Sequence, residues 1–344
     1  MACPSGAACR AVRVAAVALA VRTAAAAATQ VAGAGDPGAA RPPSRPATRA
    51  ALAALTAHAA AGAEALRRDE LRRDLLRRLN EERAAAGAPP LRPVAALDRA
   101  AQQHVDELVA AGSLEAGNRP EQAMQRRLRE AGYDARQWAE NVMSGPAGAA
   151  QLVATWREDD TDGTFRRLLE PAYTDLGIGF GRLDGSPVYS ILFAEPESAA
   201  FARDTAGLRD LERVRAELLT RIDAERRRAR RQPLALDTRL DLAAQRHAED
   251  MLARSYFAHR GPSGTTVRER ARAAGYEWSA IGENLAEGQQ SVKEVVEGWM
   301  RSAAHRENIL DRRFTQTGVG LALGRDPKTG EYRILWVQTF GLPR

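Results

Sequence analysis

Cysteine, lysine and aromatic residues are scarce in this chain of 344 residues. Both cysteines, Cys3 and Cys9, lie among the first ten residues, so the rest of the chain can form neither an internal disulfide nor a cysteine metal site. Only Lys293 and Lys328 are lysines, and arginines alternate with acids along expected helices, as between residues 67 and 83. This mixing is typical of solvated helix faces with i, i+4 ion pairs. We therefore expect no nucleic-acid partner, despite a net charge of +6.

Several familiar motifs are also missing. The sequence contains no GxxxxGK[ST] phosphate loop, no HExxH helix and no GxSxG nucleophile elbow. Gly318-Val319-Gly320 lies within an expected strand, and no helix follows it to receive a phosphate. The apolar runs stay far below the roughly 20 residues that a membrane-spanning helix needs. We expect neither a nucleotide site nor a membrane span.

The first 69 residues lack the pattern of a folded core. Residues 1–35 place Arg10 and Arg13 before an apolar run and an alanine tract, which is similar to a secretory leader. A disordered start is the alternative. Residues 36–69 are predicted as a linker, rich in Gly, Pro, Ala and Arg up to residue 50, followed by a helix from about Ala51.

The rest of the chain contains an internal repeat with an offset of 143 residues. The matched pairs are His104 and His247, Glu140 and Glu283, Trp156 and Trp299, and, after a slip to an offset of 141 and a return to 143, Tyr189 and Tyr332. Such a match predicts duplication of a whole domain. We place the first domain at residues 70–196, a linker helix at 197–212 and the second domain at 213–344.

Each copy reads as helices followed by a closing hairpin, which indicates an α+β fold. In the second copy the hairpin strands are expected at Thr317–Leu323 and Tyr332–Phe340, with turn residues between them. A preceding helix is predicted from an apolar stripe with i, i+3, i+4 spacing. The stripe consists of Val292, Val295, Val296, Trp299 and Ala303, and His305 falls off it if the helix continues that far.

The candidate chemical residues are His259, Glu283 and His305, all in the second copy. Two imidazoles and a carboxylate suit either a zinc site with an open position or acid–base work. Their separations of 24 and 22 residues carry no metal signature. Glu283 has a structural alternative, holding loop amides, because it persists as Glu140 in a copy without either histidine. His247 lies on an apolar helix face and, like its match, is interpreted as a core histidine.

The motifs of the second copy resemble a known family. They are His247-Ala248-Glu249-Asp250-Met251, Tyr256-Phe257-Ala258-His259, Gly282-Glu283-Asn284, Trp299-Met300-Arg301-Ser302-Ala303-Ala304-His305 and Gly318-Val319-Gly320. In this order they resemble a bacterial CAP domain, the family of cysteine-rich secretory proteins, antigen 5 and plant pathogenesis-related proteins. The resemblance covers about residues 213–344, and it is fainter over residues 70–196.

The resemblance implies two tandem α-β-α sandwich domains, each with a cleft that in the family carries two histidines and two acids. By position, the histidines correspond to His259 and His305 and one acid to Glu283, while Ser302 stands where the second acid is expected. A divalent metal such as zinc, reported in some members, would then be held by His259 and His305. In the first copy the histidine positions fall at Ala116 and near Thr164, so that copy is degenerate.

The resemblance also implies a secreted or periplasmic location. The leading hypothesis is a binding module for a lipid, a cell-wall component or a protein partner. A metal-dependent hydrolase that uses the same cleft, with Glu283 as orienter or base, is a second hypothesis. An inert structural envelope protein is a third.

Overall fold

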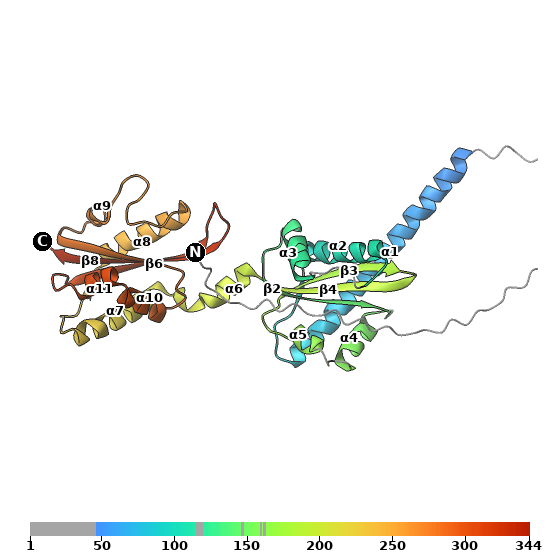
Figure 1. Cartoon of the computed structure of the whole chain (residues 1–344), viewed down its shortest axis with the longest axis horizontal. Coiled ribbons are helices and arrows are strands. Elements are labelled where there is room, and N and C mark those ends of the chain that lie inside the picture. Colours follow the sequence, from blue (N-terminus) through green and yellow to red (C-terminus); the bar gives the residue numbers. More distant parts are fainter. Residues whose placement is uncertain (1–45, 115–119, 146–147, 159, 161–162) are drawn as a thin grey trace, which may run out of the picture. The chain divides into compact units, whose positions relative to one another are not determined.

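The chain divides into two compact units, the first ending at Glu197 and the second beginning at Ser198. The computed structural model describes residues 46–114, 120–145, 148–158, 160 and 163–344. The predicted leader, both cysteines and Ala116 lie outside these described residues. Each unit is a four-stranded sheet with helices on both faces, as Figure 1 shows. The predicted α+β class with two α-β-α sandwiches is therefore confirmed.

The second unit carries the histidines. Its sheet has the order β5-β7-β8-β6, with β5 parallel to β7 and the other neighbours antiparallel. Its elements are α7 (Leu211–Arg228), β5 (Ala235–Leu236), α8 (Thr238–Ala253), α9 (Val267–Ala273), β6 (Trp278–Glu287), α10 (Val292–Arg301), α11 (Ala303–Leu310), β7 (Gln316–Arg325) and β8 (Tyr332–Pro343).

The first unit repeats this plan, with the strand order β1-β3-β4-β2. Its elements are α1 (Pro46–Ala85), β1 (Arg92–Pro93), α2 (Ala95–Ala111), α3 (Pro120–Glu130), β2 (Ala135–Ser144), α4 (Ala149–Glu158), α5 (Thr164–Leu168), β3 (Asp175–Leu183) and β4 (Ser186–Pro196). Helix α1 begins at Pro46, five residues before the expected start. Proline is tolerated in the first turn of a helix, where its missing N–H would have no partner.

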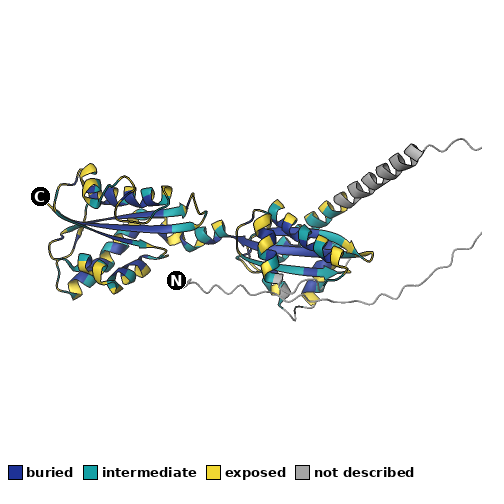
Figure 2. Cartoon of the chain, turned by 45° about the horizontal axis from the view of Figure 1, so that its top comes forward, coloured by how far each residue is buried: buried dark blue, intermediate teal, exposed yellow. Residues whose placement is uncertain are grey.

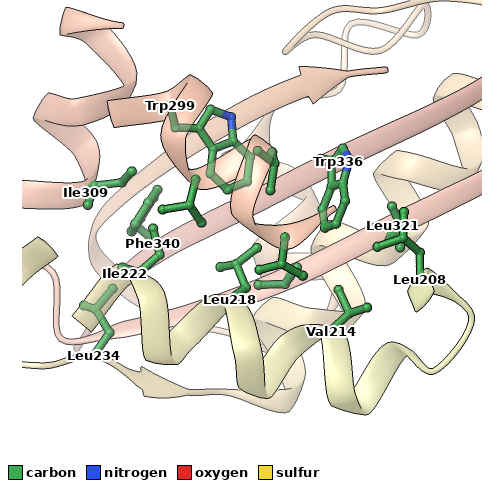
Figure 3. Close-up of a cluster of buried hydrophobic side chains, with 14 of the residues drawn as sticks. Leu208, Val214, Leu218, Ile222, Leu234, Trp299, Ile309, Leu321, Trp336 and Phe340 are labelled. Atoms are coloured by element: carbon green, nitrogen blue, oxygen red, sulfur yellow. The ribbon is translucent and has the colours of Figure 1, made fainter. Parts of the chain in front are cut away.

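The core of the second unit lies on both faces of its sheet. Helices α7, α10 and α11 cover one face, where Trp299 and Trp336 are enclosed by aliphatic side chains (Figure 3). Helices α8 and α9 cover the other face, around Met251 and Tyr276. Figure 2 shows the result, with buried residues along the strands and exposed ones on the outer helix surfaces. The sheet is therefore the middle layer of three.

Helix α8 packs directly against the backbone of β7. A Cβ atom on Gly318 would lie 2.1 Å from the carbonyl carbon of Leu240, so only glycine allows this approach. The contact also supplies acceptors to the strand, since Asp241 Oδ1 accepts from the Val319 N–H at 2.7 Å. The two glycines on either side of Val319 therefore allow helix–sheet packing. This role agrees with the sequence analysis, which expected no nucleotide site here.

The hairpin register corrects the predicted repeat. Tyr189 pairs with Phe180 in the first unit, and Trp336 pairs with Leu321 in the second. Because Phe180 and Leu321 are equivalent at the offset of 141, Tyr189 corresponds to Trp336 and not to Tyr332. The reason is a longer hairpin: the turn has two residues in the first unit and six, 326–331, in the second, and the second unit has one more strand pair, Arg325 with Tyr332. The offset on the last strand is thus 147, not 143.

Two arginines expected on solvated faces are instead fully buried. Arg226 donates to four backbone carbonyls, at Gln232, Ile309, Asp311 and Phe314, over 2.6 to 3.0 Å. Its twin Arg83 donates in the same way to the carbonyls of Pro89, Leu168, Glu170 and Tyr173. Burial lowers the pKa of both guanidinium groups. Each arginine ties the end of the first long helix to the segment before the hairpin.

The segment predicted as one linker helix, 197–212, is divided. Helix α6 (Glu197–Asp204) and a 3₁₀ turn, η1 (Ala206–Leu208), precede α7. Asp210 begins α7 as its N-cap, because its side chain accepts from the Arg213 N–H at 3.1 Å. In the second unit Phe201 of α6 stacks on Tyr332, with ring centroids 4.6 Å apart.

Candidate functional site

The candidate site of the second unit is built around Glu283, in the middle of edge strand β6. The carboxylate is almost completely buried, with 2% of the side chain exposed. One oxygen, Oε1, lies 2.9 Å from His259 Nδ1, and the other, Oε2, accepts from Arg270 Nη2 at 2.6 Å. A buried carboxylate is stable only with such partners. Both oxygens are therefore already occupied.

His259 lies in the loop between α8 and α9 and connects this buried charge to the surface. Its side chain is 62% exposed, which confirms that it is not a core histidine. A carboxylate can only accept, so Nδ1 of His259 carries the proton toward Glu283. In the neutral form of the ring, the other nitrogen, Nε2, has the lone pair. The loop is fixed from behind, because both Nη atoms of Arg270 donate to the His259 carbonyl at 3.1 Å.

His305 reaches the site through a break in the predicted helix. Helix α10 ends at Arg301, Ser302 has an extended backbone with φ −88° and ψ 122°, and α11 starts at Ala303. The expected stripe therefore stops at Trp299, and Ala303 is exposed rather than apolar core. The new helix direction places His305 in the first turn of α11.

Asparagine side chains attach this turn to β6. Asn284 Nδ2 donates to the His305 carbonyl at 3.0 Å, and Asn308 Nδ2 donates to the Glu283 carbonyl at 3.1 Å. Partial burial lowers the pKa of His305, and the positive charge of His259 lowers it further. The two imidazoles are thus close enough to interact electrostatically. Ser302, the fourth predicted site residue, marks the break and makes no side-chain cap to α11.

Two further residues lie around Glu283: Arg270, which the sequence analysis missed, and His247, which it identified as a core histidine. Arg270 was not selected, although its match at the offset of 143, Arg127, is also an arginine. His247 is buried as predicted, but it is more than a core residue: Nε2 lies 3.0 Å from the Ala258 carbonyl and 3.9 Å from Glu283 Oε1. Burial lowers the pKa of His247, while the charge of Glu283 opposes that shift. It therefore supports the loop that carries His259.

The first unit satisfies the equivalent carboxylate internally. Glu140 Oε1 accepts from Ser190 Oγ at 2.6 Å and lies 2.6 Å from His104 Nδ1. Both the histidine and the acid are nearly buried. Arg127, the match of Arg270, donates instead to Glu107, Nη2 to Oε2 at 2.5 Å. Of the two positions that lost histidine, Thr164 begins α5 and the other is not described. This arrangement presents no histidine next to its acid at the surface.

A three-residue metal site does not form with the predicted acid. Within the residues that the structure describes, no group of three or more His, Cys, Asp and Glu side chains is placed to hold a metal ion. Glu283 is committed to His259 and Arg270. The two predicted ligands, His259 and His305, would therefore each offer one ring nitrogen to a metal ion, without a carboxylate beside them.

Comparison with known proteins identifies the family. The family model for the cysteine-rich secretory protein family, CAP, matches residues 76–193 and 219–340. The matched segments cover more than half of the chain and one lies in each unit. The chain belongs to the CAP family. It contains two tandem CAP domains, and the site described above lies in the second.

Curated relatives of the chain include two proteins of Bacillus subtilis strain 168. The uncharacterized protein YkwD is 35% identical over 118 residues, which are 34% of this chain and 43% of YkwD. The uncharacterized membrane protein YlbC is 32% identical over 75 residues, 22% of each chain. The chain thus spans less than half the length of these relatives. Within the described residues, no helix combines the length and apolar character needed to cross a membrane.

Solved structures that the chain matches include an extracellular protein with an SCP domain from Bacillus anthracis. It is 21% identical, with a TM-score of 0.35 over 45% of this chain and 52% of that one. An outer surface protein from Borrelia burgdorferi is also 21% identical, with a TM-score of 0.33 over 38% of this chain and 92% of that one.

Proposed function

We propose that this CAP protein is an extracytoplasmic binding module, secreted or periplasmic, which takes its ligand at the histidine site of the second unit. The ligand class is a lipid, a cell-wall component or a protein partner. The observation that carries the proposal is the exposed His259 ring, whose Nδ1 is fixed by buried Glu283. Fixing one nitrogen orients the other toward a ligand. The leader-like residues 1–35 and the secretory family support the location.

A divalent ion such as zinc fits this arrangement. Ligating histidines commonly donate their second ring N–H to a carboxylate, which is the relation between His259 and Glu283. The lowered pKa of His305 favours the neutral ring, which is the form that binds metal. His259 and His305 would hold the ion, and the ion would supply a Lewis acid for an anionic or carbonyl group. With only two protein ligands, a bound partner would have to complete the coordination.

The hydrolase hypothesis is less well supported. Glu283 is poorly placed as a base for water, because its carboxylate already holds His259 and Arg270, so a hydrolase would have to use His259 as its base with Glu283 as the orienter. Ser302 cannot replace the base. The inert structural hypothesis fits the first unit, where Glu140 is paired internally, better than the second. Binding therefore describes the second unit best.

The test is zinc titration of the full chain by calorimetry, with cobalt absorption as a second readout. We expect one saturable site, which is lost in the double variant His259→Ala, His305→Ala. A matched control is His104→Ala, which removes a histidine beside the equivalent acid of the first unit and should leave the titration unchanged.

Two results would count against the proposal. The metal part fails if wild type does not bind zinc saturably, or if the double variant binds it as well as wild type does. The binding assignment fails if wild type hydrolyses a peptide, ester or cell-wall substrate and the double variant does not. In that case the hydrolase hypothesis replaces it.

A further inference from the structure

Six arginines gather at one end of the second unit, in two turns that are bonded to each other. The first comprises the last turn of α7 and the residues after it, and the second follows α11. Arg226 Nη1 donates to the carbonyls of Ile309 and Asp311, and Arg231 Nε donates to the Leu310 carbonyl at 2.8 Å. The two turns are therefore held side by side. We call their arginines the arginine surface; they are Arg227, Arg228, Arg230, Arg231, Arg312 and Arg313.

The first unit builds the same two turns without any of these charges. Arg83 ties its turns together through the same carbonyl positions as Arg226 does. In place of the six arginines it has Ala84, Ala85, Gly87, Ala88, Pro171 and Ala172. The turns thus fold and pack with alanine and glycine, and the arginines are not needed for the fold.

One of the arginines occupies a backbone conformation that favours glycine. Arg230 has φ 54°, and its match Gly87 has φ 72°. A residue with a side chain is strained in this left-handed region, whereas glycine is not. The second unit therefore has a strained arginine at the position where the first unit has an unstrained glycine. Strain of this kind is a pointer to function.

Most of the charge on this surface is available to a partner. Arg227, Arg230 and Arg312 are exposed and make no ion pair or side-chain hydrogen bond within the described part of the chain. Arg228 pairs with Glu225, and Arg313 pairs with Asp311 at 2.6 Å. Within the described residues, two of the six arginines thus form ion pairs, and Glu307 adds its negative charge near Arg313. A surface with this excess attracts anions.

We propose that the arginine surface binds a flexible polyanionic chain that carries phosphate groups. Arginine presents a planar fork of donors that matches phosphate oxygens. Residues 227–232 and 311–313 contain no large apolar side chain to insert into a membrane. They also contain no aromatic ring on which a nucleic-acid base would stack. The surface lies at the end of α11 away from His305, so the inference goes beyond the histidine site and does not depend on it.

The test measures binding of fluorescently labelled inorganic polyphosphate to the full chain by anisotropy, between about 50 and 200 mM salt. The test variant carries Arg227→Ala, Arg228→Ala, Arg230→Gly and Arg312→Ala. The first three changes introduce the residues of the first unit, and alanine replaces the proline that the first unit has at the fourth position. We expect at least a tenfold loss of affinity at the lower salt. We also expect the slope of log affinity against log salt to become shallower by about 3, close to 0.7 for each lost contact.

The control variant removes the same charge from dispersed, exposed positions of the second unit: Arg213→Ala, Arg246→Ala, Arg254→Ala and Arg272→Ala. The affinity of this control variant for polyphosphate should fall by less than about threefold, because affinity comes from contacts with the phosphates and not from net charge. The unfolding midpoint of the control variant should be close to that of wild type, and the midpoint of the test variant should not be lower, because Arg230→Gly relieves backbone strain. If the test variant is unstable, Arg227→Glu with Arg312→Glu, which breaks no described ion pair, should also abolish binding.

Three results would overturn the proposal. The first is equal loss in the test and control variants, which would show attraction by net charge alone. The second is binding of anionic phosphatidylglycerol vesicles through these arginines without binding of polyphosphate, which would indicate a membrane surface. The third is tighter binding of a single-stranded oligonucleotide than of polyphosphate. The variant His259→Ala, His305→Ala should retain polyphosphate binding, which keeps this result separate from that of the histidine site.

Discussion

The change Arg270→Met tests whether Arg270 is the main partner of the buried carboxylate in the histidine site. The arginine donates to Glu283 Oε2 and to the carbonyls of His259 and Thr265. Removing one partner of a buried ion pair costs about 3–5 kcal/mol, because the remaining charge is left uncompensated. His259 still donates to Glu283, so we expect the lower end, about 3 kcal/mol.

The first unit supplies a matched control in Arg127→Met. Arg127 is as buried as Arg270, with 4% and 11% of the side chains exposed. Its partner Glu107 is 39% exposed, however, and becomes hydrated when the arginine is removed. An ion pair with an exposed member is worth about 1 kcal/mol or less. The difference between the two variants therefore isolates the cost of a buried, unpaired carboxylate.

Hydrogen exchange read by mass spectrometry during urea unfolding measures each unit separately. We expect Arg270→Met to destabilise peptides of the second unit, with the largest loss of protection in the loop that carries His259. In a double-mutant cycle with Glu283→Gln, the coupling energy should be about 2 kcal/mol. The reasoning is refuted if Arg270→Met costs no more than Arg127→Met, or if the coupling is below about 0.5 kcal/mol.

Two further predictions concern the interior. Arg226→Met leaves four carbonyls of the second unit without their donor and should cost about 3–5 kcal/mol in the same exchange experiment; a cost below about 1 kcal/mol would contradict the role of Arg226 in joining the two turns. His247→Gln tests the lowered pKa of His247. Below the ordinary histidine pKa of about 6.5 the unfolded chain takes up a proton that the folded chain resists, so the wild type loses stability as pH falls from there through the lower folded pKa. The variant should lose less between pH 7.5 and 5, and equal losses in urea unfolding would refute the assignment.

The parts of the fold that depend on local apolar patterns could be predicted from the sequence. The strands expected at Thr317–Leu323 and Tyr332–Phe340 lie within β7 and β8. The stripe from Val292 to Trp299 is buried in α10. These patterns are local because each strand or helix buries one face against the same sheet. Exposure of His259 could also be predicted, since it follows from a polar turn.

The parts that depend on distant contacts could not be predicted. The break at Ser302 has no local signal, because serine is tolerated within helices. The break follows from packing: Ile309 is buried in the core, and its carbonyl accepts from Arg226. Likewise, the sequence of a charged helix does not show which of its arginines is buried among carbonyls and which lies on a solvated face. Only the repeat offered a signal, because Arg83 and Arg127 recur as Arg226 and Arg270.

The two units stabilise the same buried acid in different ways, and this difference locates the chemistry. In the first unit Ser190 donates to Glu140, and in the second unit the structurally equivalent residue is Val337, which has no donor. Glu283 is instead paired with Arg270 and with His259, most of which is in solvent. A buried charge then orients a ring at the surface. The valine at position 337 therefore leaves Glu283 without the serine donor of its equivalent in the first unit, and the partners that replace this donor include a ring at the surface.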